Sequence, residues 1–426
     1  MRGAIVLLLV FTCLSQGAAE DAPRLRVDDK DVVLPGGLQR TADGRTWITA
    51  SDLRRALDVI VKPVIPRPPQ GRKPDRRRER EGWLLCGLEA CETYRGEVTG
   101  IAADPAFELA KVAKLLGMRH RVKGSVHDVQ TPRGRWSVPT PKRARMGRLL
   151  PNVELTFMDG GTHRIREARG KRLLLVTWAS WSPTRTLLDP WRSAIVQRAS
   201  KDVILVLAAI DVEGEEHVRN YAQFAGATNV AIDRHATLAR HLPMTDVGHW
   251  YYIDELGVLR AEGKRPDADA LAWIDLLLAE TPTPREPTPP GRTPRVDLTV
   301  LRERADAEPK RAEPLLALLA ALKGSEHAAE RLKRTKDLVA AHPKVAPFAF
   351  RLAALHLEAG DRPSAIAVLD EARRRVPKAW YLRKQYWALW QPNRYYAGPI
   401  DTAWEREQRK QEEKEFGNPG RRGRRR

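Results

Sequence analysis

The sequence predicts an α/β central domain between an α+β N-terminal domain and an all-α C-terminal domain. Three observations support this division. Between residues 151 and 280, near-continuous apolar runs alternate with helical patterns, as in a mixed sheet flanked by helices. A stretch with six prolines, residues 281–296, reads as an extended linker. The pattern after this linker is purely helical, and prolines recur in it every 34 residues.

The length and composition set broad limits on what the chain can be. A chain of 426 residues is long enough for two or three domains, and a hydrophobic content of 42% can build their cores. The net charge of +20 favours anionic partners or surfaces. No aromatic residues are interleaved with the basic stretches in the way that base stacking requires, so we expect no specific nucleic-acid partner.

The N-terminus has the features of a secretory signal. Arg2 precedes a short apolar run, residues 4–14, and the small residues at 17–19 suit a cleavage site. We therefore expect residues 1–19 to be a signal peptide and the protein to be exported, to the periplasm or the outside of a bacterial cell. An uncleaved anchor is the alternative. No other apolar run is long enough to predict a membrane span after signal removal.

Two cysteines, Cys86 and Cys91, remain after the signal. They lie in GWLLCGLEACETYRG, which predicts two strands joined by four residues, with the two sulfur atoms opposite each other. Disulfides persist in exported proteins, so a structural disulfide is the interpretation we favour. A metal site would need a second pair of ligands, and a catalytic disulfide would need a motif that stabilises a thiolate. Neither is evident nearby.

Residues 20–150 predict a small α+β domain with a Pro/Arg-rich insertion at residues 63–82. A strand at residues 46–48 leads into a helix, for which Ser51 is a plausible N-cap. This segment, GRTWITASDLRRAL, resembles the N-terminal stalk domain of copper amine oxidases. The resemblance implies a stalk-like module. It brings no copper ligands, and we infer no copper.

The central elements follow one another from residue 151 to residue 280. A hairpin is expected first, followed by the buried strand RLLLVTWAS, a helix over residues 182–200 and the second buried strand DVILVLAAID. A helix at residues 215–226 and a strand-plus-helix unit at 228–244 come next. A strand–turn–strand segment, residues 248–264, and a closing helix, residues 267–280, complete the predicted domain.

The turn after the first buried strand reads TWASWSPTRT. It is similar to the active-site segment of the TlpA-type thiol–disulfide oxidoreductases, which have a thioredoxin-like fold and lie near the AhpC/TSA redoxins. Trp178, Ala179 and Trp181 match the family's F-W-A-x-W-C-x-x-C pattern, while Ser182 and Arg185 stand where it has cysteines. The resemblance implies a thioredoxin-like domain over residues 151–280.

Two further positions depart from that family. Gly248 stands where the resemblance implies a cis-proline, and Val176 stands where thioredoxin has a buried acid. Dithiol exchange needs a thiolate that attacks a disulfide sulfur, which neither serine nor arginine can provide. No cysteine follows Cys91. We therefore predict a vestigial active site at Trp181, Ser182, Arg185 and Gly248, with no catalytic residue and no cofactor.

Individual side chains near this turn have simpler expected roles. We expect Ser182 to cap the following helix, with Pro183 at its first position. Arg185 is expected to be solvated, Trp178 to lie in the core and Trp181 to be partly exposed. A second group, His235, His241 and His249, does not predict a metal site, because residues six apart do not share a helix face.

The C-terminal helices have a regular spacing. Pro309, Pro343 and Pro377 are 34 residues apart, and residues 346–377 resemble a tetratricopeptide unit. The resemblance implies a tetratricopeptide-like domain at 297–395, with a capping helix near 378–389. Unrelated helical hairpins are the alternative. An aromatic group in this region more often forms core or cap than a binding site; it comprises Trp380, Tyr381, Tyr386, Trp387, Trp390, Tyr395 and Tyr396. We expect residues 396–426 to be a charged basic tail.

Two functions follow from these features. The first is an exported thioredoxin-like protein without redox activity, which binds protein partners through the thioredoxin-like groove and the helical repeats. Its basic tail would bind anionic envelope polymers or lipid. The alternative is a thiol–disulfide oxidoreductase or a redoxin-class enzyme that uses Cys86 and Cys91, or the cysteines of a partner.

Overall fold

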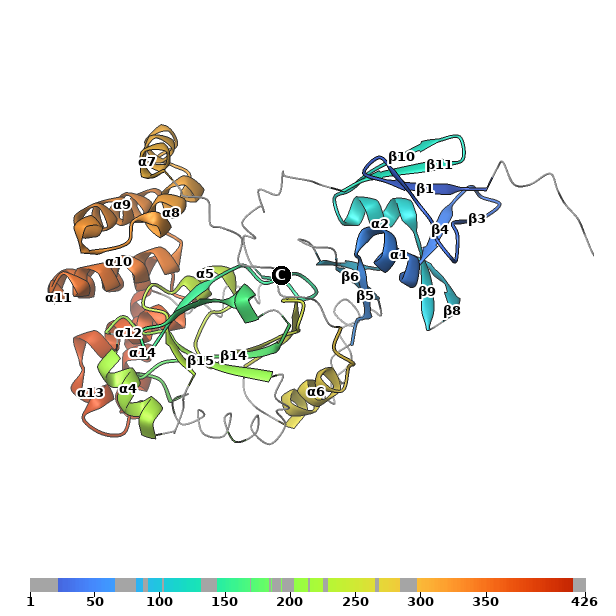
Figure 1. The fold of residues 1–426 in the computed structure, drawn as a ribbon. Helices are drawn as coiled ribbons and strands as arrows, with labels where there is room; N and C mark the ends of the chain where they lie inside the picture. Colours follow the sequence, from blue (N-terminus) through green and yellow to red (C-terminus); the bar gives the residue numbers. More distant parts are fainter. Residues whose placement is uncertain are drawn as a thin grey trace, which may run out of the picture. The chain divides into compact units, whose positions relative to one another are not determined.

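The computed structural model divides the chain into two compact units (Figure 1). The first contains residues 1–64 and 80–137, and the second contains residues 65–79 and 138–426. The described residues are 22–65, 82–86, 91–101, 103–131, 144–168, 170–183, 185, 193, 203–213, 215–224, 229–264, 268–283 and 297–416. The predicted signal and most of the predicted insertion lie outside them. Within these ranges, no helix has the length and apolar character that crossing a membrane requires.

The first unit consists of short strands and two helices, as predicted for an α+β domain. Its sheets have the strand orders β10-β11-β1-β2, β3-β4-β9-β8 and β5-β6-β7. The elements are β1 Arg24–Val27, β2 Lys30–Val32, β3 Gln39–Arg40, β4 Thr46–Thr49, α1 Ala50–Leu57, β5 Ile60–Pro63, β6 Trp83–Cys86, β7 Cys91–Tyr94, β8 Val98–Ile101, β9 Asp104–Glu108, α2 Leu109–Leu115, β10 Arg119–Lys123 and β11 Val126–Gln130. Leu53 of α1, Phe107 of β9 and Val112 of α2 pack together in one core. The stalk-like identity of this unit stays a prediction.

Helix α1 begins at Ala50, two residues earlier than a cap at Ser51 would place its start. Its N-cap is Thr49, whose side-chain oxygen accepts a hydrogen bond from the Asp52 backbone N–H at 3.2 Å. The extended backbone of Thr49 places its hydroxyl at the helix end, which is the usual N-cap geometry. Ser51 lies inside the first turn, and its N–H donates to the Asp104 carboxylate at 2.8 Å.

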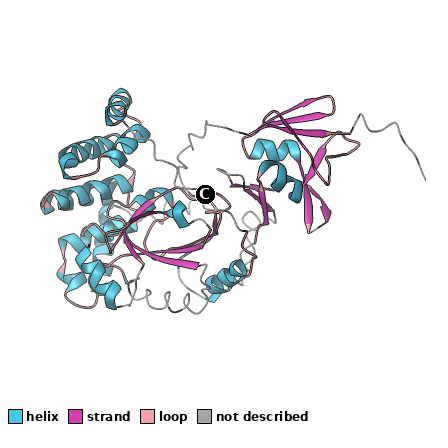
Figure 2. Ribbon diagram, viewed as in Figure 1, coloured by secondary structure: helices cyan, strands magenta, loops and turns pink. Residues whose placement is uncertain are grey.

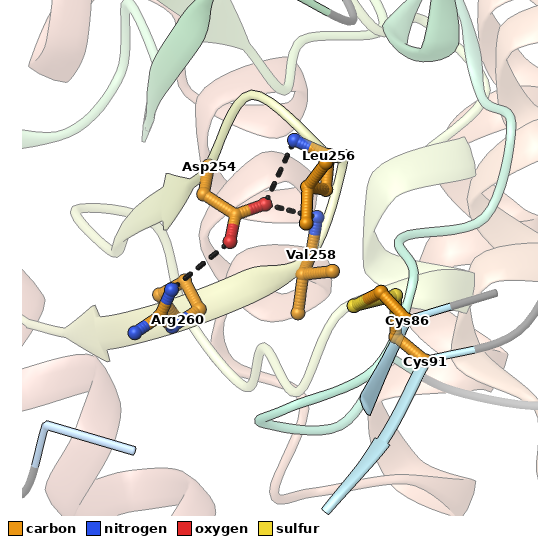
Figure 3. The surroundings of a disulfide bond; sticks show 6 residues. All are labelled: Cys86, Cys91, Asp254, Leu256, Val258 and Arg260. Atoms are coloured by element: carbon orange, nitrogen blue, oxygen red, sulfur yellow. Dashed lines mark hydrogen bonds and ion pairs between the residues drawn. A yellow bond between two sulfur atoms is a disulfide. The ribbon is translucent and has the colours of Figure 1, made fainter. Parts of the chain in front are cut away.

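The predicted disulfide between Cys86 and Cys91 is present (Figure 3). Strands β6 and β7 are antiparallel, and the two cysteines are direct partners in the register, with their Cα atoms 4.1 Å apart. Both side chains are buried. The hairpin register therefore brings the sulfur atoms together, as the sequence spacing suggested.

Reduction of this disulfide should loosen the first unit without unfolding it. Closing so short a loop removes little entropy from the unfolded chain, so we expect a loss of about 2 kcal/mol or less in its free energy of unfolding. Mass spectrometry of non-reduced peptides should show a linked pair that is two hydrogens lighter than the dithiol. Alkylation of both cysteines in the untreated protein would contradict the prediction.

The second unit contains a seven-stranded sheet in the order β13-β12-β16-β15-β14-β17-β18. Strand β14 is parallel to β15 and antiparallel to β17, and β18 is antiparallel to β17. The elements are β12 Glu154–Phe157, β13 Thr162–Arg164, η1 Ile165–Ala168, β14 Arg172–Trp178, β15 Val203–Ala209, α4 Glu215–Phe224, β16 Val230–Ile232, α5 Thr237–His241, β17 Trp250–Ile253, β18 Leu259–Gly263 and α6 Ala268–Leu278. The order β15-β14-β17-β18 followed by α6 is the arrangement that the thioredoxin-like prediction requires. Strand β14 is buried at all seven positions, which explains its continuous apolar sequence.

This unit begins earlier in the chain than predicted. The sequence analysis started the central domain at residue 151, whereas residues from 138 onward belong to this unit. The Leu150 N–H donates to the Gly257 carbonyl and the Gly147 N–H to the Leu259 carbonyl, both at 2.8 Å. Residues 144–150 therefore belong with the central sheet. These residues are held by backbone hydrogen bonds, which do not depend on a recognisable pattern of side chains.

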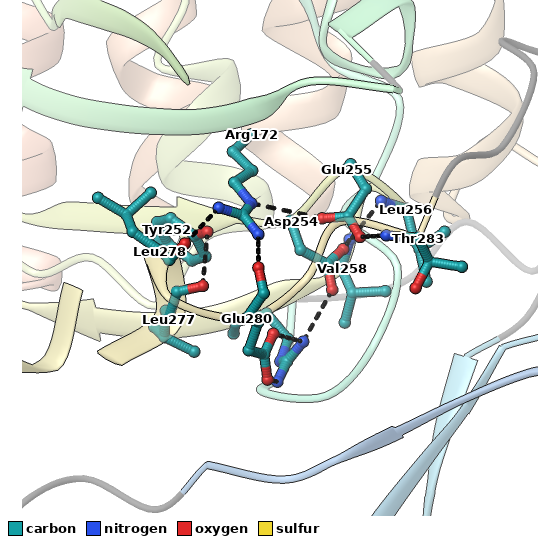
Figure 4. Close-up of polar contacts among 11 residues, drawn as sticks. Arg172, Tyr252, Asp254, Glu255, Leu256, Val258, Leu277, Leu278, Glu280 and Thr283 are labelled. Carbon is teal, nitrogen blue, oxygen red and sulfur yellow. Dashed lines mark hydrogen bonds and ion pairs between the residues drawn. The ribbon is translucent and has the colours of Figure 1, made fainter. Parts of the chain in front are cut away.

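Buried charges fasten the end of α6 to the sheet (Figure 4). Arg172 of β14 donates from Nη1 to the Leu278 carbonyl at 2.7 Å and lies 3.7 Å from the Glu255 carboxylate. The other Glu255 oxygen accepts from the Thr283 N–H at 2.8 Å. Arg260 of β18 adds an ion pair with Glu280 at 2.7 Å. The first residues of the predicted linker are thus bound to the central domain.

The C-terminal part is helical, as predicted (Figure 2). The elements are α7 Leu298–Ala307, α8 Ala312–Ala321, η3 Ser325–His327, α9 Ala328–Ala341, α10 Ala346–Glu358, α11 Arg362–Arg375, α12 Trp380–Trp390, α13 Asn393–Tyr396 and α14 Thr402–Phe416. Helices α8, α10 and α12 begin 34 residues apart, and so do α9 and α11. Each proline of the 34-residue period lies three residues before α8, α10 or α12. The period therefore marks a repeated pair of helices, and its tetratricopeptide identity stays a prediction.

Part of the segment predicted as a charged tail is folded. Residues Thr402–Phe416 form α14, and its Glu412 is buried against α11 and α12. Because the segment is highly charged, the sequence analysis did not predict that it would fold as a helix with Glu412 facing inward. Residues 417–426 of the predicted tail lie outside the described residues.

The helices and the sheet share one core. Leu175 of β14 and Ala208 of β15 belong to the same buried cluster as Phe350 of α10, Leu369 of α11 and Leu382 of α12. The C-terminal helices therefore pack on one face of the central sheet. This packing decides what surrounds the predicted vestigial site.

Candidate functional site

The site lies where the parallel strands β14 and β15 end. Adjacent parallel strands place their carboxyl ends at the same edge of a sheet, where α/β folds build their sites. The turn after β14 carries Ser180, Trp181 and Ser182, and the turn after β15 carries Asp211 and Glu213. The Ser180 N–H donates to Asp211 Oδ2 at 3.1 Å, and its hydroxyl donates to the same oxygen. These contacts join the two turns.

Trp181 is fully buried, so the prediction that it is partly exposed was wrong. Its indole N–H donates to Gln385 Oε1 of helix α12 at 2.8 Å. The same amide oxygen accepts from the Val212 N–H at 3.2 Å. Helix α12 therefore covers the turn and supplies the polar partner that a buried indole N–H requires. Trp178 lies in the core, as predicted.

Replacing Gln385 by leucine should destabilise the packing of α12 on the sheet by about 3 kcal/mol. The change leaves two buried donors, the Trp181 indole N–H and the Val212 N–H, without their acceptor, and each costs about 1–3 kcal/mol. Urea unfolding followed by tryptophan fluorescence measures the loss. Gln411→Leu, the same change at an exposed position on α14, should shift the free energy of unfolding by no more than about 0.5 kcal/mol. Equal stability of the two variants would contradict the assigned contact.

Ser182 is buried too, and Arg185 is partly buried and hydrogen-bonded within the fold. Arg185 Nη1 donates to the Ser180 carbonyl at 2.9 Å and to the Tyr395 carbonyl at 3.2 Å. Its guanidinium lies 4.1 Å from the centre of the Tyr221 ring. The prediction of a solvated Arg185 was wrong because the chain after α12 folds back over this turn. The Arg185 N–H donates to the Ser182 carbonyl at 3.0 Å, so the two positions are one turn apart, and most of the predicted helix 182–200 lies outside the described residues.

Gly248 adopts a backbone conformation that excludes proline. Its φ angle is +86°, whereas the proline ring fixes φ near −65°. Its N–H, which proline lacks, donates to the Thr177 carbonyl at 2.7 Å. Glycine is the residue that best tolerates this left-handed conformation. The loop before β17 is therefore built differently from a cis-proline loop.

Burial dominates the electrostatics of the site. Burial raises the pKa of the Asp211 carboxyl to about 7. The hydrogen bonds from Ser180 lower this pKa, and the repulsion of Glu213 raises it. Burial also raises the pKa of the Tyr396 phenol well above its usual value. The Tyr396 ring stacks on His217 with their centres 3.8 Å apart, and Arg362 Nη1 donates to Glu213 Oε1 at 2.7 Å. The C-terminal helices thus bring a phenol and a guanidinium to two carboxyl groups of the sheet.

The three candidate histidines contact different residues: Glu358 for His235, Arg240 for His241 and Tyr251 for His249. His235 Nε2 lies 3.8 Å from the Glu358 carboxylate, and burial lowers the pKa of its imidazole to about 3. Burial likewise lowers the pKa of His249 to about 4. The part of the chain that the structure describes contains no group of three or more histidine, cysteine, aspartate or glutamate side chains that could hold a metal ion.

Three residues of the site, Asp211, Glu213 and Gln385, were missed by the sequence analysis, and Tyr396 was named there only as a member of the aromatic group. Asp211 had a usable signal, because it is the first charged residue after a buried apolar run and so marks the carboxyl end of a strand. Gln385 is a lone amide in the aromatic-rich helix α12. Nothing in the sequence links it to Trp181, which is 204 residues away.

The comparisons with known proteins found solved structures that cover about a third of this chain. No model of a protein family matches the chain, and no curated protein matches it. A solution structure described as a protein disulfide isomerase from Bacteroides thetaiotaomicron is 23% identical, covers 32% of this chain and 92% of its own, and has a TM-score of 0.30. A thiol:disulfide interchange protein, DsbE, from Chlorobium tepidum is 20% identical over 32% of this chain and 96% of its own, with a TM-score of 0.28. StoA from Bacillus subtilis is 19% identical over 29% and 99%, with a TM-score of 0.25. The fold is therefore described from the order and directions of the strands in the central sheet.

Proposed function

We propose that this protein is an exported, redox-inactive thioredoxin-like protein that works by binding in the cell envelope. The burial of Trp181 beneath helix α12, with Gln385 as its hydrogen-bond partner, carries the proposal. The position of the family's first cysteine, Ser182, is buried as well. A thiol–disulfide oxidoreductase must expose a sulfur to a partner, whereas this edge of the sheet is occupied by the protein's own helices.

The expected partner groove changes under this proposal. Besides Gln385, the backbone N–H of Trp380 donates to the Thr245 carbonyl at 2.8 Å, just before the loop of Gly248. A protein that bound at the former groove would have to displace α12 and lose both contacts. We therefore assign protein binding to the helical repeats, since stacked helix pairs build extended binding surfaces. Export rests on the signal-like N-terminus.

Restoring the two cysteines tests the fold and the closed site together. In the double variant Ser182→Cys, Arg185→Cys, the sulfur atoms should lie one turn apart and form a reversible disulfide. We expect the wild-type protein to show no insulin reduction or peroxide turnover and the double variant to show weak activity at best. The buried position and the conformation of Gly248 both oppose it. A pair that cannot be oxidised under mild conditions would overturn the assignment of the two positions.

The alternative enzyme remains measurable in the same assay. Thiol–disulfide turnover by the wild-type protein that disappears in Cys86→Ser would establish the redox function at Cys86 and Cys91. The burial of both sulfur-bearing side chains opposes that outcome, because exchange requires in-line access of a partner thiolate to one sulfur atom. A matched control is Ser182→Ala, which removes the vestigial hydroxyl and should leave any such turnover unchanged.

A further inference from the structure

A cavity lies where the central sheet meets the C-terminal helices. It has a volume of about 370 Å³, within the range of small-molecule sites. One wall is formed by the loop residues Thr245 and Asp246 and by Lys264, which follows β18. The opposite wall is formed by α12 and α14 and contributes Trp380, Lys384, Trp387, Glu405, Arg406 and Arg409.

The walls are held in place by contacts on both sides. The Trp380 N–H donates to the Thr245 carbonyl at 2.8 Å, which joins α12 to the loop. The Trp387 indole N–H donates to Glu412 at 3.1 Å, which joins α12 to α14. The centre of the Trp380 ring lies 4.4 Å from the guanidinium carbon of Arg383 and 4.9 Å from that of Arg409. A flat indole is therefore fixed in one wall of the cavity.

The charges of the lining do not balance. Four cationic side chains, Lys264, Lys384, Arg406 and Arg409, line the cavity with two carboxylates. Arg409 is also paired with Glu413 beside the cavity, at 3.1 Å, so one positive charge remains in excess. Lys384 is mostly buried, and its Nζ lies 3.9 Å from Glu405, beyond hydrogen-bond distance. Arg406 is held through Nε by the Thr402 carbonyl at 3.2 Å, and a guanidinium has further N–H groups that bind a carboxylate or phosphate. The excess charge favours an anionic ligand.

The two carboxylates make the ligand more specific than a bare anion. Asp246 and Glu405 are acceptors, to which a hydroxyl group can donate and a chloride ion cannot. We propose that this cavity binds an anionic sugar, a monosaccharide unit that carries a carboxylate or a phosphate. This site is independent of the proposed protein binding by the helical repeats.

Calorimetric titration of the full mature chain tests the proposal with glucuronate and glucose 6-phosphate. We expect at least one of them to bind, and glucose and inorganic phosphate to bind about tenfold more weakly. The double variant Lys264→Gln, Arg406→Gln should weaken the anionic sugar by about tenfold or more. The control Lys410→Gln, Lys414→Gln removes the same charge from α14 outside the cavity and should leave the affinity unchanged.

Three results would overturn the site. The first is no binding of either anionic sugar at about 10 mM, well above a weak specific affinity. The second is an equal loss in both double variants, which would show general attraction to a basic protein. The third is inorganic phosphate binding as tightly as the sugars, which would show a bare anion site. Circular dichroism of each variant confirms that it is folded, so a loss of binding is assigned to the cavity.

Discussion

Replacing Glu412 by alanine is expected to destabilise the C-terminal helices by about 3–5 kcal/mol, the cost of breaking a buried ion pair from one side. Glu412 accepts from Arg373 Nη1 at 2.6 Å and from the Trp387 indole N–H at 3.1 Å, and it lies 2.7 Å from Arg383 Nε. All three ionised side chains are buried. The alanine variant leaves Arg383 in the core without this carboxylate, and water cannot replace it there.

The same change should open the vestigial site. Helix α14 loses its buried anchor, and α12, which covers Trp181, loses a partner at Trp387 and Arg383. We expect a lower thermal midpoint and faster proteolysis within the C-terminal helices. Glu407→Ala removes an exposed carboxylate from α14 and should change the free energy of unfolding by less than about 0.5 kcal/mol. A Glu412→Ala protein as stable as Glu407→Ala would show that the buried pair contributes nothing.

The second large effect is on pH dependence, at Asp211. The folded pKa of about 7 lies above the unfolded value of 3.8, so the folded protein binds this proton more tightly than the unfolded chain. Stability is therefore greatest below about pH 4 for this group and falls as the pH rises to about 7. The total loss is about 4 kcal/mol, from about three pKa units. Above pH 7 the folded state must hold an ionised Asp211 next to Glu213.

Asp211→Asn should remove this pH dependence. Asparagine keeps an oxygen that can accept from the Ser180 N–H and hydroxyl, and it cannot ionise. Between pH 4.5 and pH 8, the free energy of unfolding of the variant should rise relative to that of the wild type by about 4 kcal/mol at most. Urea unfolding at each pH measures this difference. Glu216→Gln removes an exposed acid from α4 and isolates the effect of net charge. A wild type and an Asp211→Asn variant with parallel pH profiles would contradict the raised pKa.

The two predictions describe one closed edge of the sheet. Asp211 bonds to Ser180 on the sheet side, and Tyr396 brings its phenol within 3.4 Å of the same hydroxyl from the helical side. Ionisation of Asp211 would place a charge beneath this contact, where little water can solvate it. Loosening the helices through Glu412 should therefore lower the pKa of Asp211 toward its ordinary value. A titration of Asp211 in Glu412→Ala measures that coupling directly.

The sequence determined the local elements because each depends on neighbouring residues. The continuous apolar run of β14 predicts a strand buried on both faces, and it is buried at every position. The spacing of Cys86 and Cys91 predicts a hairpin pair, which the register confirms. The 34-residue period predicts the starts of α8, α10 and α12. The sequence alone likewise shows that Ser182 and Arg185 are not cysteines and that no cysteine follows Cys91.

Only the tertiary structure decided what covers the predicted vestigial site. Trp181 looks like an exposed side chain in a turn, and it is buried because Gln385 from α12 meets it across 204 residues. The charged composition of residues 402–416 did not predict α14. This helix packs on the fold through Glu412, which pairs with two buried arginines. Contacts between distant segments depend on how whole elements pack, and no periodicity within either segment records them. The sequence thus determined that this edge has no cysteine, and the packing of the C-terminal helices determined that it is closed.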